Sequence, residues 1–414
     1  MNHSVLSMLT IRLTALRTAA LTAVLSGTLM AGPTLSHAGD EPLLVEATYL
    51  KRAEAKRIPL SLLDLPIEDN GIPGARLGLR DNQTTGGFLG QEHTLEEVVI
   101  GEDEDIVARY KELLATGKKL FVADLNAKDL LAIADVDPDV LLFSIRAQDD
   151  SLRSADCRAN VFHIPPSRGM VTDALAQYLN WKRWNEVVLV TGRYDTDKAY
   201  ADAFRRSAKR FGLKIVEEKD WTAAPGARRT DSGHHSLQQE VPVFTHFKDH
   251  DVVIVADEED EFGEYLSYRS TRPRPVAGTH GLLSIAWHRT QEQWGATQIQ
   301  RRFEKLAGRW MTERDYAAWA SMRALGEATT NTNSNKVVDI RDFLLSDKLK
   351  LAGFKGVPLS FRRWNGQLRQ PILLVAPRVL ISVSPQQGFL HEFSTLDTMG
   401  LDVSESACTQ FNPE

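Results

Sequence analysis

Short apolar runs alternate with longer, helix-like segments along most of this chain. The runs consist mainly of Val, Leu, Ile and Phe, without the apolar–polar alternation of a half-exposed strand. Such runs are typical of strands that helices cover on both faces, as in parallel sheets. The predicted strands are 58–63, 120–123, 140–145, 187–190, 213–216, 251–256 and 275–278. The sequence therefore predicts an α/β fold with doubly wound parallel sheets and right-handed crossovers.

The segments between and after these strands have helical spacing. One helix follows 120–123 and can be capped by Asn126, and another ends at Gly212, a residue suited to the position after a helix. The predicted helices are 74–85, 170–179, 197–210, 292–306, 312–329 and 339–346. Residues 223–229 are polar and rich in turn formers, so we expect an exposed loop there.

Towards its end the chain changes from strand–helix alternation to a predicted hairpin. Asn365-Gly366 lies between the apolar runs 357–364 and 368–375. An Asn-Gly pair in this setting is the strongest short-range signal for a hairpin. Residues 379–383 add one more extended segment.

Residues 1–38 have the order of features of a secretory signal peptide. Arg12 and Arg17 precede an apolar run from Ala19 to Met30, and the small residues around Ala38 resemble a cleavage site. The apolar run is shorter than the roughly 20 residues that a spanning helix needs. We therefore expect export to the periplasm and cleavage after Ala38, with no lipid anchor.

The remaining residues, 39–414, exceed one typical domain of about 100–200 residues, which predicts two lobes. The formal net charge is −6, and it becomes −8 without Arg12 and Arg17. An acidic chain of this kind has no electrostatic reason to bind nucleic acid or anionic lipid.

The sequence contains two cysteines, Cys157 and Cys408. Export places them where disulfides persist, so we predict a bridge between them. A loop of this length would contribute at most about 4–5 kcal/mol in the chain-entropy model. Two buried free thiols are the alternative.

The common catalytic and metal-binding patterns are missing from the sequence, so we expect neither an enzyme nor a required cofactor. Residues 135–139 begin like a calcium loop but lack its later Gly and Glu. Four histidines, His234, His235, His246 and His250, match no common zinc spacing, and we expect no metal. The acidic runs 102–105 and 257–261 are expected to be solvated, although one member of the second could face a cleft.

In doubly wound sheets, ligands bind beyond the carboxyl ends of the strands. Arginine suits carboxylates, and aromatic side chains stack on rings, so these ends favour a planar, anionic, aromatic ligand. Two further tryptophans, Trp310 and Trp319, are assigned to core packing. The rule nominates Asp64, Asp124, Arg146, Asp149, Arg193, Tyr194, Asp257, Thr279, His280 and, just after a strand end, Trp287.

Three stretches resemble the type I periplasmic solute-binding proteins of the leucine/isoleucine/valine-binding kind. They are 143–149, the helix-to-strand junction 204–216, and the closing hairpin 356–366. The resemblance covers about 58–383 and implies two lobes joined by several crossing segments. It assigns 39–165 to the first lobe, 166–285 to the second, and 286–414 to segments that complete both lobes and the hinge.

More specifically, 81–90, Trp287-His288 and 294–296 resemble the subgroup associated with alcohol dehydrogenase systems that depend on pyrroloquinoline quinone (PQQ). This resemblance implies a monomeric binding protein for an ABC importer in the inner membrane. PQQ is then the leading ligand, since it is a planar tricarboxylate. The turn 123–127 lacks the Ser or Thr of the amino-acid binders, which argues against an amino-acid ligand.

Three alternatives stay open. The ligand could be a branched-chain amino acid, an amide or an alcohol-derived acid. The chain could instead be an accessory protein that docks on a periplasmic quinoprotein dehydrogenase. An enzyme would be supported only by the clustered histidines and acids, with His280 as the residue to test.

Overall fold

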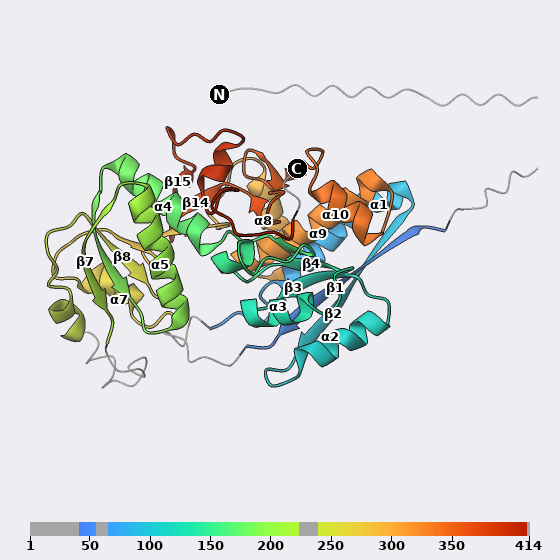
Figure 1. Ribbon diagram of the computed structural model, residues 1–414, viewed down its shortest axis with the longest axis horizontal. Coiled ribbons are helices and arrows are strands. Elements are labelled where there is room, and N and C mark those ends of the chain that lie inside the picture. Colours follow the sequence, from blue (N-terminus) through green and yellow to red (C-terminus); the bar gives the residue numbers. More distant parts are fainter. Residues whose placement is uncertain (1–40, 55–64, 223–238, 412–414) are drawn as a thin grey trace, which may run out of the picture. The chain divides into compact units, whose positions relative to one another are not determined.

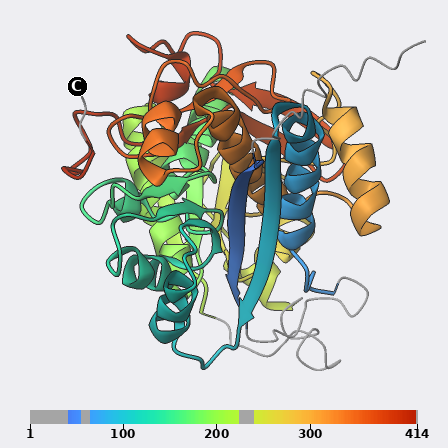
Figure 2. The ribbon, with the colours of Figure 1, turned by 90° about the vertical axis from the view of Figure 1, so that its right-hand side faces the viewer.

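The computed structural model describes residues 41–54, 65–222 and 239–411, which form two large sheets and one small sheet (Figure 1). The first large sheet is entirely parallel, in the order β2-β1-β3-β4-β5. Its strands are β1 (Leu43–Arg52), β2 (Gln91–Ile100), β3 (Leu120–Asp124), β4 (Leu141–Ser144) and β5 (Val161–His163). Figure 2 shows β1 and β2 side by side.

Helices cover both faces of this sheet, and the side chains of β1 alternate between them. Tyr49 faces a core shared with α1 (Ile72–Leu89), α8 (Ala296–Ala307), α9 (Glu313–Thr332) and α10 (Val337–Leu344). Leu50 faces the opposite core, with α2 (Ile106–Ala115) and α3 (Ala127–Ala134). Burial on both faces explains why the central strands are continuous apolar runs.

The second large sheet has the order β15-β14-β10-β9-β8-β6-β7. Neighbours from β7 to β10 run parallel, whereas β14 and β15 are antiparallel additions. One face packs on α4 (Arg168–Lys182) and α5 (Asp195–Arg210), and the other on α7 (Gly263–Arg269). The strands are β6 (Glu186–Thr191), β7 (Lys214–Asp220), β8 (Val252–Ala256), β9 (Val276–Gly278), β10 (Leu282–Ile285), β14 (Ile372–Ala376) and β15 (Val379–Ser384).

The chain passes between the two large sheets three times: from β5 to α4, from β10 to α8, and from β13 (Leu368–Arg369) to β14. Buried side chains join the first crossing to the third. The Gln367 amide donates to the Pro165 carbonyl at 3.0 Å, and the Gln370 amide donates to the Ile164 carbonyl at 2.6 Å. Lys355 in turn donates to the Gln370 side-chain oxygen at 2.6 Å.

The predicted fold class is confirmed, and the predicted strands and helices from 74 onward, apart from the closing hairpin, match elements of the structure within a few residues at each end. Asn126 accepts a hydrogen bond from the Asp129 amide as the N-cap of α3, and Gly212 has a left-handed φ of 72° after α5. Strands β1 and β2 were missed because charged residues interrupt both. β2 tolerates charged residues because it is an edge strand, and four of its ten residues are exposed.

The closing hairpin is shorter than predicted. Only β12 (Pro358–Phe361) and β13 pair around Asn365-Gly366, in a small sheet with β11 (Leu351–Ala352). The run 368–375 was predicted as one strand, but it divides between β13 and β14, which belong to different sheets. The division falls at Gln370-Pro371, since Pro371 has no N–H for a ladder and Gln370 turns to Ile164.

Three predictions fall outside the described residues: the signal peptide 1–38, the strand 58–63 with Asp64, and the loop 223–229. Of the helices that the structure describes, none combines the length and apolar character that a bilayer crossing requires.

The predicted disulfide is confirmed. Cys157 and Cys408 are bonded across 251 residues of sequence, with their Cα atoms 5.6 Å apart. The bond ties the C-terminal segment to the turn after the short 3-10 helix η1 (Asp150–Arg153).

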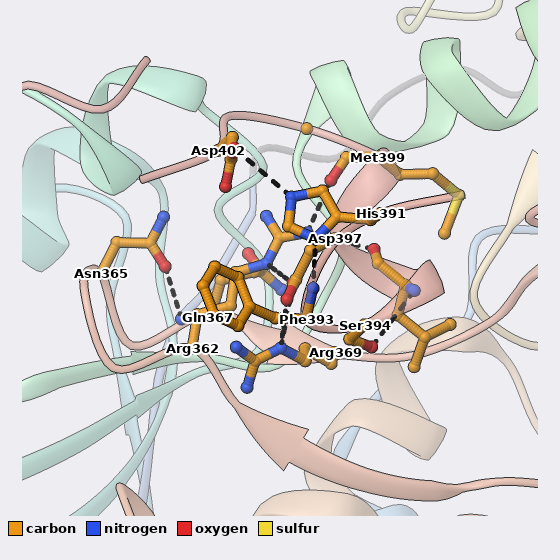
Figure 3. Close-up of polar contacts among 12 residues, drawn as sticks. Arg362, Asn365, Gln367, Arg369, His391, Phe393, Ser394, Asp397, Met399 and Asp402 are labelled. Atoms are coloured by element: carbon orange, nitrogen blue, oxygen red, sulfur yellow. Dashed lines mark hydrogen bonds and ion pairs between the residues drawn. The ribbon is translucent and has the colours of Figure 1, made fainter. Parts of the chain in front are cut away.

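A buried acid organises the same C-terminal segment (Figure 3). Asp397, in the 3-10 helix η2 (Thr395–Thr398), is fully buried and accepts hydrogen bonds from Arg362 at 2.8 Å and Arg369 at 2.9 Å. Arg362, itself 1% exposed, also donates to the Met399 carbonyl at 2.6 Å. One carboxylate therefore compensates two guanidinium groups that lie largely out of water.

We predict that Asp397→Asn lowers the free energy of unfolding by about 3–5 kcal/mol, because it leaves a buried arginine without its counter-charge. Urea unfolding at pH 7 measures this. Asp347→Asn is the matched control, since Asp347 pairs with Arg363 at 2.9 Å but its side chain is 95% exposed. That loss should stay below about 1 kcal/mol. Equal effects of the two substitutions would contradict the role given to Asp397.

Candidate functional site

Each large sheet has one topological switch point. In the first sheet, β2 is added on one side of β1 and β3 on the other, so the switch point lies between β1 and β3. In the second sheet, β7 and β8 lie on opposite sides of β6, so the switch point lies between β6 and β8. At a switch point the two loops leave towards opposite faces and open a crevice beyond the carboxyl ends of the strands. These two strand-end regions, here called the first edge and the second edge, are the candidate ligand-binding surfaces.

At the first edge, Asp124 ends β3 and is fully buried. It accepts a hydrogen bond from the Tyr49 hydroxyl at 3.0 Å, and the Lys51 ammonium lies 4.0 Å away. Arg314, at the start of α9, approaches to 3.6 Å. Burial raises the pKa of Asp124, although Arg314, Lys51 and Arg146 act to lower it.

A second carboxylate at the first edge contacts two arginines. Glu54, two residues after β1, is 2.8 Å from Arg314 and 3.1 Å from Arg146, which follows β4. Burial acts to raise the pKa of Glu54, but the two arginines outweigh it and the pKa is lowered. Among the described residues of the first edge, Arg146 and Arg314 thus share the Glu54 carboxylate, and Lys51 and Arg314 lie near Asp124.

At the second edge, Arg193 and Tyr194 follow β6 and both contact Glu261. The Arg193 guanidinium donates to Glu261 at 2.8 Å, and the Tyr194 hydroxyl donates at 3.1 Å. Tyr194 is 40% exposed. A pocket of about 460 Å³ next to it is lined in part by Arg193, Lys198 and Arg205.

Asp257 and Thr279 have mainly structural contacts at this edge. Asp257 is 2% exposed and accepts hydrogen bonds from the amides of Glu261, Phe262 and Gly263, which fixes the turn after β8. The Thr279 hydroxyl accepts from the Asp257 amide at 2.9 Å. Within the acidic run 257–261, the buried Asp257 carboxylate is therefore occupied by hydrogen bonds from backbone amides.

His280 lies between a hydroxyl and an acid. Its Nδ1 is 3.0 Å from Thr279 Oγ1, and its Nε2 is 3.0 Å from Asp260 Oδ1. Gly263 is required beside it, because a Cβ there would lie 2.2 Å from Nδ1. Burial lowers the pKa of His280, but Asp260, Asp257 and Glu264 outweigh burial and the pKa is raised.

The ligating atoms of Asp257, Asp260 and His280 lie within 4.8 Å of one another, so these residues could hold a metal ion. Of the four clustered histidines, His246 is exposed and His250 is buried, and neither belongs to this group. His234 and His235 lie outside the described residues.

Arg168, which the sequence did not single out, connects the two edges. It is 7% exposed at the start of α4 and forms two hydrogen bonds of 2.7 Å with Glu258, which follows β8. It also donates to Asp149, after β4, at 3.0 Å. The predicted site residue Asp149 therefore takes part in a contact between the two strand-end regions.

Trp287 lies elsewhere than predicted. It was expected to stack on a ligand, but it is 1% exposed and stacks on Tyr316, with ring centroids 4.4 Å apart. Trp319 is buried as predicted, whereas Trp310 was assigned to the core and is 52% exposed. Trp310 lies in the connection before α9, where Arg289 covers its ring at 5.9 Å.

The site residues that sequence reasoning missed are Tyr49, Lys51, Glu54, Arg168 and Arg314. Tyr49 and Lys51 belong to β1, and Glu54 follows it; β1 is one of the strands that the sequence analysis missed. A prediction of β1 would have nominated Lys51 and Glu54 by the same strand-end rule. Arg314 and Arg168 are at helix starts, and no local signal in the sequence relates them to a strand end.

A scan of the sequence against protein-family models gives no match, and a search of curated proteins also gives none. Solved structures do match. A branched-chain amino acid ABC transporter periplasmic ligand-binding protein from Burkholderia xenovorans aligns with a TM-score of 0.65 and 13% identity, over 88% of this chain and 99% of that one.

Two other solved structures match over similar lengths. A periplasmic binding protein from Burkholderia mallei has a TM-score of 0.62 and 12% identity, over 89% of this chain and 99% of that one. A solute-binding protein of an ABC transporter from R. palustris, in complex with benzoate, has the same TM-score and identity, over 88% and 99%. The chain therefore has the fold of these periplasmic binding proteins.

We predict that His280 stabilises the fold in a pH-dependent way. Because its folded pKa is raised, its contribution is fully present below the unfolded value of about 6.5 and is lost as the pH rises through the folded value. The difference in unfolding free energy between wild type and His280→Gln should therefore shrink from pH 6 to pH 9. Denaturant unfolding across this range measures it.

Asp260→Asn should weaken this dependence, since it removes the negative charge of the residue that accepts from Nε2. A difference between wild type and His280→Gln that stays constant with pH would show that the Asp260 contact does not favour the imidazolium.

Proposed function

We propose that this protein is the periplasmic substrate-binding component of an ABC uptake system. Its fold supports this proposal, since the matching structures are solute-binding proteins of such systems. The arrangement of the sheets supports it too, because each gathers charged side chains at its switch point and Arg168 joins the two edges. The signal-peptide pattern of residues 1–38 and the disulfide agree with a periplasmic location.

In this proposal, 39–165 and 166–285 form two lobes, and 286–414 completes both and supplies part of the hinge. The three crossings between the sheets suit a hinge motion that closes the lobes over one solute. The closed form would present the solute to a permease in the inner membrane. The protein acts as a monomer and needs neither a cofactor nor catalytic residues.

The ligand that we propose is an anion with an aromatic or otherwise planar frame, with PQQ as the leading candidate. The observation that carries this is the convergence of Arg146 and Arg314 on one position at the first edge. Tyr194, 40% exposed at the second edge, adds an aromatic side chain of the kind that stacks on planar rings. The benzoate complex of the R. palustris protein is a precedent for an aromatic carboxylate in this fold.

A second candidate is a branched-chain amino acid, which the name of the B. xenovorans protein favours. A third is an accessory protein that docks on a periplasmic quinoprotein dehydrogenase and imports nothing.

Isothermal titration of the purified protein with PQQ, benzoate and leucine tests the proposal. We expect PQQ or benzoate to bind, and Arg146→Ala to weaken that binding at least about tenfold, as for the loss of a charge-assisted hydrogen bond. Arg109→Ala, at an exposed ion pair on α2, is the control and should bind as wild type does.

If leucine alone gives a heat of binding, the proposed anionic aromatic ligand is wrong and the ligand is an amino acid. If no solute binds and a dehydrogenase co-purifies, the accessory role is supported and the transport role is overturned.

A further inference from the structure

Glu54 contacts two arginines of the first edge at once. Arg146 and Arg314 come from different elements, the segment after β4 and the start of α9. Both guanidinium groups approach the same oxygen, Oε1, of Glu54, at 3.1 and 2.8 Å. Two guanidiniums that converge on one carboxylate oxygen form a strong carboxylate site.

This position is open to solvent although its surroundings are not. The Glu54 side chain is 43% exposed, and the arginine side chains are 26% and 23% exposed. Asp124, which is fully buried, lies 3.6 Å from Nε of Arg314, whereas Glu54 contacts Nη1 of the same guanidinium. A solute carboxylate can therefore reach the two guanidiniums from the side on which Glu54 now lies.

Glu54 and Arg314 are positioned by different kinds of structure. Strand β1 ends at Arg52, and the Ala53 amide still donates to the Ile100 carbonyl at 2.8 Å. Arg314 belongs to the first turn of a 20-residue helix. Arg314 is thus fixed by a helix, whereas Glu54 lies just beyond the end of its strand.

We infer that Glu54 is an internal competitor: its carboxylate occupies the position that a carboxylate of the solute takes in the bound protein. This inference rests on the proposed function and specifies how that site is regulated. Solute binding then requires Glu54 to leave the two arginines, and the apparent affinity is reduced by the fraction of molecules in which Glu54 holds them. Without a solute, the Glu54 carboxylate attracts both guanidiniums.

Glu54→Gln tests this, with PQQ and benzoate as the titrated probes and benzamide as an uncharged one. The amide keeps the size of the side chain but loses the charge that competes. We expect binding of the two carboxylates to tighten roughly tenfold, as when a competent state rises from about a tenth of the population to nearly all of it. Benzamide should bind both proteins alike.

Two controls separate competition from simpler effects. Glu112→Gln removes a carboxylate from an exposed ion pair on α2 and should leave the affinity unchanged. Repeating the titrations at 0.02 and 0.5 M NaCl removes long-range attraction, since the Debye length falls below about 5 Å at the higher salt. A gain that persists at high salt supports direct competition, and a gain that vanishes there overturns it.

The outcomes for the inference and for the proposed function are distinct. Equal carboxylate affinities of wild type and Glu54→Gln would overturn the competitor role and leave the binding function standing. If neither protein binds any probe, the binding of anionic aromatic solutes and the competitor role both fall. Thermal unfolding of each variant verifies that it is folded.

Discussion

The direction of the strands is the constraint on which the rest of this structure depends. All five strands of the first sheet run parallel, and so do β6 to β10 of the second. Parallel strands need a crossover after each strand, so every carboxyl end in a sheet lies on the same edge. Polar residues that are distant in sequence are brought together there. This is why Lys51, Asp124 and Arg146 form one charged group although 95 residues separate the first from the last.

The crossings between the sheets are held by polar side chains in the interior rather than by apolar packing alone. Gln367 and Gln370 are fully buried, and their amides join the first and third crossings. Hydrogen bonds of this kind have strict geometry, and leaving one partner unpaired costs about 1–3 kcal/mol. They therefore favour one arrangement of the crossings. In the proposed transport role, solute binding would move the lobes about these segments, with Arg168 linking the two edges in the present arrangement.

The charges at the two edges differ in how they are compensated. At the second edge, Arg193 is matched by Glu261, and the buried Asp257 is used by backbone amides. At the first edge the guanidiniums of Arg146 and Arg314 share one carboxylate, that of Glu54, whose side chain is 43% exposed at a strand end. Two guanidiniums in a partly buried region attract an anion strongly, because burial strengthens electrostatic attraction. The first edge is therefore where we place the carboxylate of the proposed solute.

The sequence by itself determined the fold class and most central strands, because strands buried on both faces must be continuously apolar. It also predicted the disulfide, since two cysteines allow a single intramolecular bond, but only the structure decided against two free thiols. The sequence also nominated Asp124, Arg146 and Arg193 at strand ends, since position along a parallel strand is a local property. Only the tertiary structure brought Arg314 to the first edge, and it alone placed Trp287 in the core. Those outcomes depend on which helix packs on which face, and that is decided by contacts between segments hundreds of residues apart, which no local pattern records.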